Sequence, residues 1–426
     1  MRKFSARPCP HRPTAAWVSA VVLASLMAGY APTPSATQAP QPPVEYLSNA
    51  LDWIETHSVK SSMVDWGALR AEALALAPHP ATTADTYPAL EHVIDEIADP
   101  VTWLSDPEEA RLQSHFGLGA IMPEAVIVEV QPGGPADQAG LRAGDVIEAV
   151  NGEPARAQHH TAWVDFGVGD IIALTVRRVG QAQPMTVTLA RRAVSPQATP
   201  TGWRHTAGQA GVGYIHLPAE SGAGWRYPTL AQQVLRAADA SAVCGWMIDA
   251  RRIAGGNLWS YLAAVGPILG EGEVGGFVYA DGTREPWAYR DGKVYWNENE
   301  RHESIVEGPL FHPKRTGLPV ALLTSQATMG AGELLLVAFS GRPDVRRFGE
   351  ATAGAPFLQF HTVLSDGAWL TVSGARAMDR TGQIYGGPIA PDEAIGTDWT
   401  NFGTEQDPVM QTALAWLLGQ PECVNG

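Results

Sequence analysis

The stretch AVIVEVQPGGPADQAGLRAGDVIEAVNGEP, residues 125–154, carries the clearest structural signals in the chain. It combines a Gly/Pro turn, a short helical segment that ends at Ala139-Gly140-Leu141, and the dipeptide Asn151-Gly152. Asn-Gly favours a tight β-hairpin turn because both residues tolerate positive φ. Short β-rich runs with Gly turns lie on both sides of the stretch, so the sequence predicts a small β-rich domain over residues 113–193.

The part of the chain that follows, residues 211–423, alternates between strand-like and helix-like runs. Strands are expected at GVGYIHL (211–217), VCGWMIDA (243–250) and PVALLT (319–324), and a β-hairpin region is expected over 274–296. Helices are expected over 228–240, 257–269, 330–339 and 407–418. This alternation predicts a layered α/β core. A Pro/Thr/Gly-rich segment, residues 194–210, is predicted to be a linker.

The N-terminal part of the chain divides into three segments. Residues 1–31 combine basic residues with an apolar run that begins at Ala15, which is the pattern of an export signal. Retention of this run as a membrane anchor is left open. Residues 32–44 are rich in Pro, Ser and Thr and are predicted to be an extended tether. Residues 45–112 repeat apolar residues at three- and four-residue steps, which predicts a helical cap.

The charge of the chain limits the classes of partner that it can bind. The net charge is −15 and Lys/Arg do not cluster, which argues against a nucleic-acid partner.

Cys9 lies in the signal, and export would permit a disulfide between Cys244 and Cys423. Because Cys244 opens an apolar strand, the sequence favours a buried, unpaired cysteine there. No Cys/His spacing predicts a metal site, and no cofactor is expected.

Two segments of the predicted core have the composition of a hydrolytic site. WMIDARRIAGGN (246–257) places Gly255 and Gly256 between a strand and a helix, where backbone N–H groups are open to a ligand. LTSQATMGAGE (323–333) leads into the next helix, whose first N–H group belongs to Ala331. Converging N–H groups stabilise a developing oxyanion, but hydrolysis also needs a nucleophile and a base. Gly255 and Gly256 are therefore expected to contribute to an oxyanion hole, and the family resemblance described next implies Ala331 as a further donor.

These segments, with LEHVIDEIADPVTWL (90–104) and GEATAGAPF (349–357), resemble the C-terminal-processing (tail-specific, tricorn-core) serine peptidases, and residues 125–154 resemble a PDZ domain. The resemblance implies a ClpP/crotonase-like layered α/β core with an inserted PDZ domain and an N-terminal helical cap. It also implies an exported, periplasmic protein whose partners are peptides or unfolded protein C-termini. The PDZ loop Gly117-Leu118-Gly119-Ala120 is then expected to bind a peptide carboxylate, beside a strand edge that can add a peptide strand.

The positions that match the catalytic residues of this family are substituted. Gly330 stands where the family has its serine, three residues before Glu333. Ala355 stands at the lysine position of one branch, and Val101 stands at the histidine position of the tricorn-like branch. Where that branch has a glutamate just before its final Pro-Asp, this chain has Tyr385, Gly386 and Gly387, and none of them carries a carboxylate. The resemblance combined with these substitutions predicts a pseudoprotease that binds peptides.

Two other functions remain open at this stage. Ser325 or Thr328 could act with His361 as a relocated pair, which would make the chain an active serine-type endopeptidase. An acyl-CoA-handling enzyme with a crotonase-like core is the third hypothesis, although a PDZ domain has no role there. A PDZ-like domain that only packs on its neighbour is a further possibility.

Other residues are weaker candidates for a functional role. Asp249 is expected either to orient the Gly255-Gly256 loop or to lie in solvent, and Glu333 is expected to interact with the dipole of its helix. His159 and His160 could contact a PDZ ligand. The aromatic residues of the hairpin region are expected to form a packing face, with peptide binding as the alternative: Trp287, Tyr289, Tyr295 and Trp296.

Overall fold

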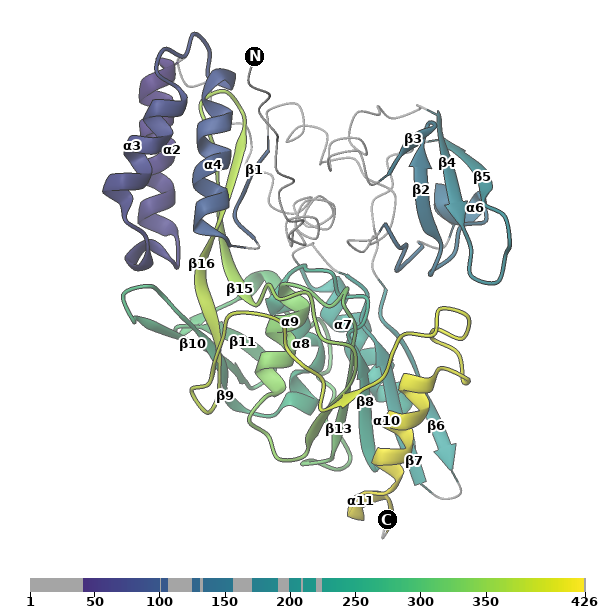
Figure 1. The fold of residues 1–426 in the computed structure, drawn as a ribbon. Coiled ribbons are helices and arrows are strands. Elements are labelled where there is room, and N and C mark those ends of the chain that lie inside the picture. The colour runs from purple at the N-terminus through teal and green to yellow at the C-terminus, as the bar shows by residue number, and fades with distance from the viewer. Residues whose placement is uncertain are drawn as a thin grey trace.

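The computed structural model describes residues 41–99, 101–105, 125–130, 133–155, 171–190, 199–207, 210–219 and 224–424. Within these ranges the chain forms a helical cap, a small β domain and a layered α/β core (Figure 1). The predicted signal, the PDZ loop Gly117-Leu118-Gly119-Ala120, and His159 and His160 lie outside them. No helix in the described part is long and apolar enough to cross a bilayer.

The core is built around a mixed sheet with the strand order β18-β14-β13-β8-β7-β6. Its strands are β6 (Thr201–Ala207), β7 (Ala210–His216), β8 (Gly245–Asp249), β13 (Val320–Thr324), β14 (Val345–Gly349) and β18 (Glu393–Ala394). All neighbouring pairs are parallel except β6 and β7, and Ile248 lies opposite both Ile215 and Leu322. Every residue of β8 and β13 is buried, as expected for parallel strands with both faces covered.

Helices cover both faces of this sheet. Helices α7 (Arg226–Ala238), α8 (Leu258–Leu269) and α9 (Ala331–Phe339) lie on one face, and α10 (Pro408–Leu418) and α11 (Pro421–Val424) lie on the other. Alternate residues of β8 divide between the two layers, since Ile248 packs with α7–α9 and Met247 packs with α10. The predicted layered α/β core is confirmed.

A second sheet connects the core to the cap. Its long central strand is β16 (Trp369–Asp379), which pairs with β1 (Trp103–Ser105), β9 (Gly272–Val278), β15 (Phe357–Val363) and β17 (Ile384–Tyr385). From β9 the sheet continues through β10 (Arg284–Arg290), β11 (Lys293–Trp296) and β12 (Asn299–Glu300). The predicted hairpin over 274–296 is confirmed.

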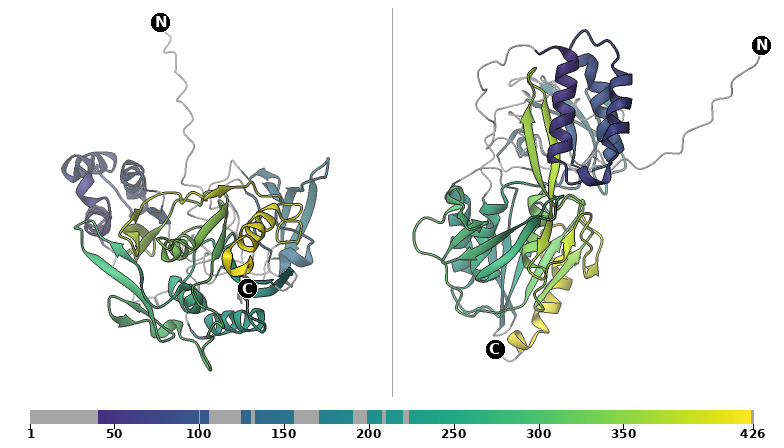
Figure 2. Two further views of the ribbon diagram at one scale, coloured as in Figure 1. Left: turned by 90° about the horizontal axis from the view of Figure 1, so that it is seen from below. Right: turned by 90° about the vertical axis from the view of Figure 1, so that its left-hand side faces the viewer.

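The cap is a three-helix unit that packs on the β15–β16 hairpin (Figure 2). It consists of α2 (Pro43–His57), α3 (Trp66–Leu76) and α4 (Tyr87–Ile97). Apolar residues of all three helices share one cluster with Leu370 and Val372 of β16. At the turn of the hairpin, Asp366 accepts hydrogen bonds from the hydroxyls of Tyr46 and Tyr87. The hairpin therefore ties the N-terminal cap to the C-terminal half of the core.

The β domain has the turn that the sequence predicts. It contains α6 (Pro135–Gln138), β2 (Val146–Val150), β3 (Glu153–Pro154), β4 (Ile171–Arg177) and β5 (Met185–Ala190). Asn151 and Gly152 join β2 to β3 with φ values of +50° and +89°. The domain contacts the core through Val126 and Val128, which pack with Ala327 and Trp399.

Three expectations from the sequence need correction. The predicted linker 194–210 contains strand β6, whose pairing with β7 is a tertiary contact that composition does not report. Helix α2 begins at Pro43, inside the predicted tether, because proline is well tolerated in the first turn of a helix. Cys244 is buried as predicted but forms a disulfide with Cys423. The expectation of unpaired cysteines is wrong because α10 brings the chain end back to the start of β8.

Candidate functional site

The two candidate segments meet at the carboxyl edge of the core sheet. Gly255-Gly256 follows β8 and Gly330 follows β13, and these strands are parallel neighbours. The N–H of Met329 donates to the Ile253 carbonyl at 2.9 Å, and Ala254 forms a β-bridge with Met329. The carboxyl edge of a parallel sheet is the usual location of binding sites in α/β proteins.

Gly330 forms a sharp turn directly before α9. Its φ is +53° and its ψ is −114°, a conformation that residues with a side chain rarely adopt. Among the described residues, apart from its neighbours along the chain, a Cβ placed at residue 330 would have one atom within 4 Å, the Cα of Gly255 at 3.5 Å. Residue 330, where the resemblance predicts a nucleophile, therefore has room for a side chain that faces the Gly-Gly segment.

Backbone donors lie around this position. Gly255 and Gly256 have φ values of +106° and +109°, and Ala331 is the first residue of α9. Within the ranges that the structure describes, the N–H groups of these three residues have no hydrogen-bond acceptor. Free N–H groups at the first turn of a helix favour a partial negative charge. The three N–H groups can therefore donate hydrogen bonds to the oxygen of a peptide carbonyl or of a carboxylate.

Glu333 connects Gly330 to Ala355, the residues at which the resemblance predicts a nucleophile and a base. Its carboxylate, fully buried, accepts hydrogen bonds from the N–H of Gly330 at 3.0 Å and from the N–H groups of Gly354 and Ala355 at 2.7 Å each. The Thr352 hydroxyl donates to the same carboxylate. Burial raises the pKa of Glu333 to about 7, against the lowering effect of its four donors. The predicted interaction with the helix dipole is only part of its role, because three of these donors come from the segment after β14.

Val101 and Ala355, the two residues at which the resemblance predicts a catalytic base, lie in an apolar cluster. Val101 and Ala355 belong to a buried group with Val59, Met329 and Phe357, and Ala254 completes it. Val101 is fully buried, and its N–H donates to the Asp99 carboxylate at 2.9 Å. The cap segment and the segment after β14 thus meet at Met329, the residue before Gly330, and both contribute apolar side chains.

The substitute residues that the sequence suggested have other partners. The Ser325 hydroxyl donates to the Arg251 carbonyl at 2.7 Å, and the Thr328 hydroxyl donates to the Ala250 carbonyl at 3.0 Å. His361 lies on β15, where its ring stacks on Trp369. Burial lowers the pKa of His361. Across the described ranges, neither hydroxyl forms a hydrogen bond with His361.

Asp249 is part of a buried ionic network. Its carboxylate binds the Arg251 guanidinium through two hydrogen bonds of 2.9 Å and 2.7 Å. Arg251 also donates to Asp407 at 2.7 Å, and all three side chains are buried. Although burial acts to raise the pKa of Asp249, the adjacent guanidinium holds it below its usual range. The alternative of a solvated Asp249 is therefore wrong.

The hairpin aromatics mostly form the packing face that the sequence predicts. Trp287 and Tyr289 are buried, with Trp287 against Phe277 and Tyr289 against Gly266 of α8. Trp296 is half-buried and stacks on Trp259. In the described residues, no group of three or more His, Cys, Asp or Glu side chains could hold a metal ion.

Sequence reasoning missed several residues that shape the site. Val59 and Asp99 come from the cap, and Asp407 comes from the far end of the chain. Asp407 precedes Pro408, which is a recognisable helix N-cap signal, but nothing local indicates that it binds Arg251. Val59 carries no signal beyond its apolar side chain.

Comparisons with known proteins agree with this architecture. Residues 211–395 match peptidase family S41, and residues 126–178 match a PDZ domain. The chain is 26% identical over 354 residues to a carboxyl-terminal-processing protease of Synechocystis sp., covering 79% of this chain and 77% of that protein. It is 26% identical over 383 residues to the corresponding Picosynechococcus sp. protease, covering 84% of this chain and 85% of that protein.

Among solved structures, the photosystem II D1 C-terminal processing protease superimposes with a TM-score of 0.61 at 21% identity. The match covers 90% of this chain and 99% of that structure, and it shows a shared fold. The family matches and the order of the cap, the PDZ domain and the core lead to one assignment. The chain contains a region of peptidase family S41 and a PDZ domain, and over most of its length it is similar to carboxyl-terminal-processing proteases.

Proposed function

We propose that this chain is an exported S41 peptidase homologue that binds extended or C-terminal peptide segments and cleaves them little or not at all. The observation that carries this proposal is the pairing of Gly330 at the nucleophile position with Val101 and Ala355 at the base positions. Removing the nucleophile or the base of a serine protease lowers kcat by roughly a millionfold. Here both are replaced.

The parts of the site that bind rather than react are retained. The N–H groups of Gly255, Gly256 and Ala331 remain available to a peptide oxygen, which supports their proposed role as an oxyanion-hole-like binding site. The match of residues 126–178 to a PDZ domain supports recognition of a peptide C-terminus by strand addition, with Gly117-Leu118-Gly119-Ala120 as the proposed carboxylate loop. Peptide or unfolded protein C-termini are therefore the proposed partners.

The proposed location is the cell envelope, with the periplasm as the specific compartment. Residues 1–31 have the pattern of an export signal. The Cys244–Cys423 disulfide supports an oxidising compartment, because thiols remain reduced in the cytosol. Retention of the N-terminal apolar run as a membrane anchor is the alternative to its role as an export signal.

A binding experiment tests the proposal directly. Fluorescent peptides of one sequence, with a free or an amidated C-terminus, are titrated into the purified protein. We expect the free carboxylate to bind at least about tenfold more tightly, because it can accept several backbone hydrogen bonds that the amide cannot. Equal affinity for the two peptides would contradict recognition of C-termini.

Activity measurements separate this function from a relocated catalytic pair. The protein is incubated with casein and with a fluorophosphonate probe, and tryptic peptides are searched for the adduct by mass spectrometry. We expect no cleavage above background and no labelled hydroxyl. An adduct on Ser325 or Thr328 together with casein cleavage would establish an endopeptidase and refute the pseudoprotease.

A further inference from the structure

Helix α10 is attached to strand β8 at both of its ends. At the N-terminal end, Asp407 caps α10 and binds Arg251, which lies two residues after β8. At the C-terminal end, Cys423 of α11 is bonded to Cys244, the residue directly before β8. Between these points α10 packs on the sheet through Met410, Ala413 and Leu417.

The ionic attachment reaches the candidate site through the backbone of Arg251. The carbonyl of Arg251 accepts the Ser325 hydroxyl, and the neighbouring carbonyl of Ala250 accepts the Thr328 hydroxyl. The N–H of Met329 donates to Ile253 in the same segment. Residues 250–254 and 325–329 are thereby held together on the two sides of the turn that contains Gly330. Arg251 therefore lies in direct contact with both segments.

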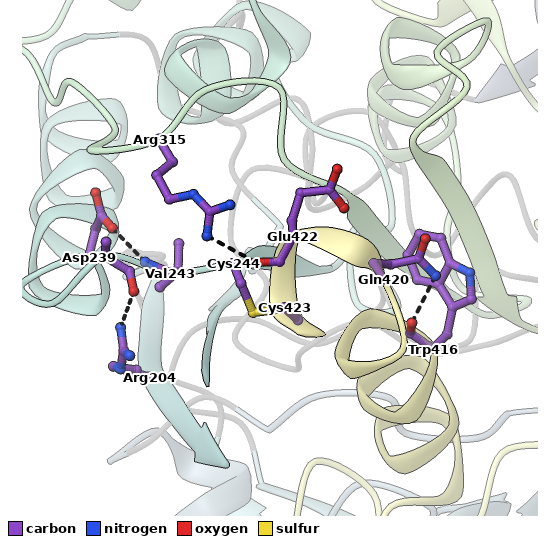
Figure 3. The surroundings of a disulfide bond; sticks show 10 residues. Arg204, Asp239, Val243, Cys244, Arg315, Trp416, Gln420, Glu422 and Cys423 are labelled. Atoms are coloured by element: carbon purple, nitrogen blue, oxygen red, sulfur yellow. Dashed lines mark hydrogen bonds between the residues drawn. A yellow bond between two sulfur atoms is a disulfide. The ribbon is translucent and has the colours of Figure 1, made fainter. Parts of the chain in front are cut away.

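The covalent attachment is the disulfide between Cys244 and Cys423, which lies close to the C-terminal end of the chain. Cys244 and Cys423 are both buried, with Cα atoms 4.8 Å apart (Figure 3). Helix α11 has only four residues, and the Glu422 carbonyl accepts a hydrogen bond from Arg315 at 3.0 Å. A short terminal helix opens at low free energy, so a reductant can reach the disulfide without unfolding the core.

We infer that residues 407–423 form a redox-sensitive brace for the candidate site, in which the Cys244–Cys423 disulfide keeps Asp407 on Arg251 and so orders residues 250–256 and 325–331. A dithiol reductant opens the brace. One thiolate attacks a cysteine sulfur and breaks the S–S bond, and the second thiolate resolves the mixed disulfide. The dithiol is oxidised by two electrons, and Cys244 and Cys423 each take up a proton as thiols. The inference holds whether the site cleaves peptides or only binds them.

Hydrogen exchange with and without dithiothreitol tests the brace on the full chain. After reduction, verified by mass spectrometry of alkylated cysteines, we expect amide exchange at Ile253 and Met329 to accelerate by roughly tenfold, since local opening governs exchange in folded proteins. Exchange in β4 and β5 of the PDZ domain should not change. The double variant Cys244→Ala with Cys423→Ala should exchange like the reduced protein and should not respond to dithiothreitol.

A matched variant separates the brace from simple fraying of the chain end. Arg315→Ala removes the contact to Glu422 but leaves the disulfide intact, so we expect faster exchange only within residues 416–424. Acceleration confined to that segment after reduction of the wild-type disulfide would overturn the inference. Loss of protection throughout the chain, including β4 and β5, would also overturn it, because the disulfide would then be a global staple.

Discussion

The backbone N–H of Gly330 donates to the carboxylate of Glu333, three residues further along the chain, at 3.0 Å. This contact resembles half of a capping box, in which a glutamate at the third helical position returns to the N-cap N–H. Here the same carboxylate also accepts the N–H of Ala355. One buried side chain therefore sets the spacing between Gly330 and Ala355, the proposed positions of a nucleophile and a base, and neither residue carries a reactive group.

Replacing Glu333 with glutamine should destabilise the fold. All four partners of the carboxylate are donors, so the NH₂ group of the introduced amide would face N–H groups with no acceptor. A buried unsatisfied donor costs about 1–3 kcal/mol, and we expect a decrease of that size in the free energy of unfolding. Urea denaturation measures it. Glu393→Gln, which breaks the half-exposed ion pair with Arg346, is the control and should change stability by less than about 1 kcal/mol.

The same residue predicts a pH dependence of stability. The pKa of Glu333 is about 7 in the folded protein and 4.5 in the unfolded chain. The folded protein therefore binds the proton of Glu333 more tightly than the unfolded chain does. The stabilisation that Glu333 adds to the free energy of unfolding is complete below pH 4.5. It is lost as the pH rises through 7. The loss approaches roughly 3 kcal/mol, from about 1.4 kcal/mol for each pKa unit.

The measurement is the difference between wild type and Glu333→Gln at pH 5 and at pH 8. His216 titrates in an overlapping range, since burial lowers its pKa to about 4, and its effect on stability has the opposite sign. Subtraction of the two proteins removes this contribution. A difference that does not change between the two pH values would show that Glu333 is ionised throughout.

Removing the side chain of Asp407 should lower the stability of the fold more than removing the side chain of the nearby Glu405. Asp407→Ala leaves the buried Arg251 with one carboxylate in place of two and removes the cap of α10. Breaking a buried ion pair by removing one partner typically costs about 3–5 kcal/mol. Thermal unfolding should show the loss as a lower Tm. Glu405→Ala, in the same loop but exposed, should leave Tm unchanged. Equal shifts in both variants would contradict the role of Asp407.

Restoring a nucleophile and a base should restore some hydrolysis if the proposed assignment of the site is right. The double variant Gly330→Ser with Val101→His places a hydroxyl beside Gly255 and an imidazole in the adjacent apolar cluster. Positive φ at residue 330 strains the introduced serine by about 1–3 kcal/mol, so expression should fall modestly. We expect slow casein cleavage and labelling of that serine by a fluorophosphonate.

Gly330→Ser alone is the matched control for that experiment. A hydroxyl without a base is a poor nucleophile at neutral pH, so the single variant should remain far less active than the double variant. Equal activity of the two variants would show that another group acts as the base. No activity in a folded double variant would point to the absent carboxylate at residues 385–387 as a further lesion.

The sequence by itself determined the layered core, the Asn151-Gly152 hairpin and the identities of Gly330, Val101 and Ala355. Hydrophobic periodicity, turn residues and side-chain chemistry are local properties, so they can be read one segment at a time. Tertiary structure alone decided the Cys244–Cys423 bond, whose partners are 179 residues apart, the linkage of Asp249 and Arg251 to Asp407, and the four donors that meet Glu333. These contacts depend on how distant strands and helices pack, and no local pattern encodes that packing.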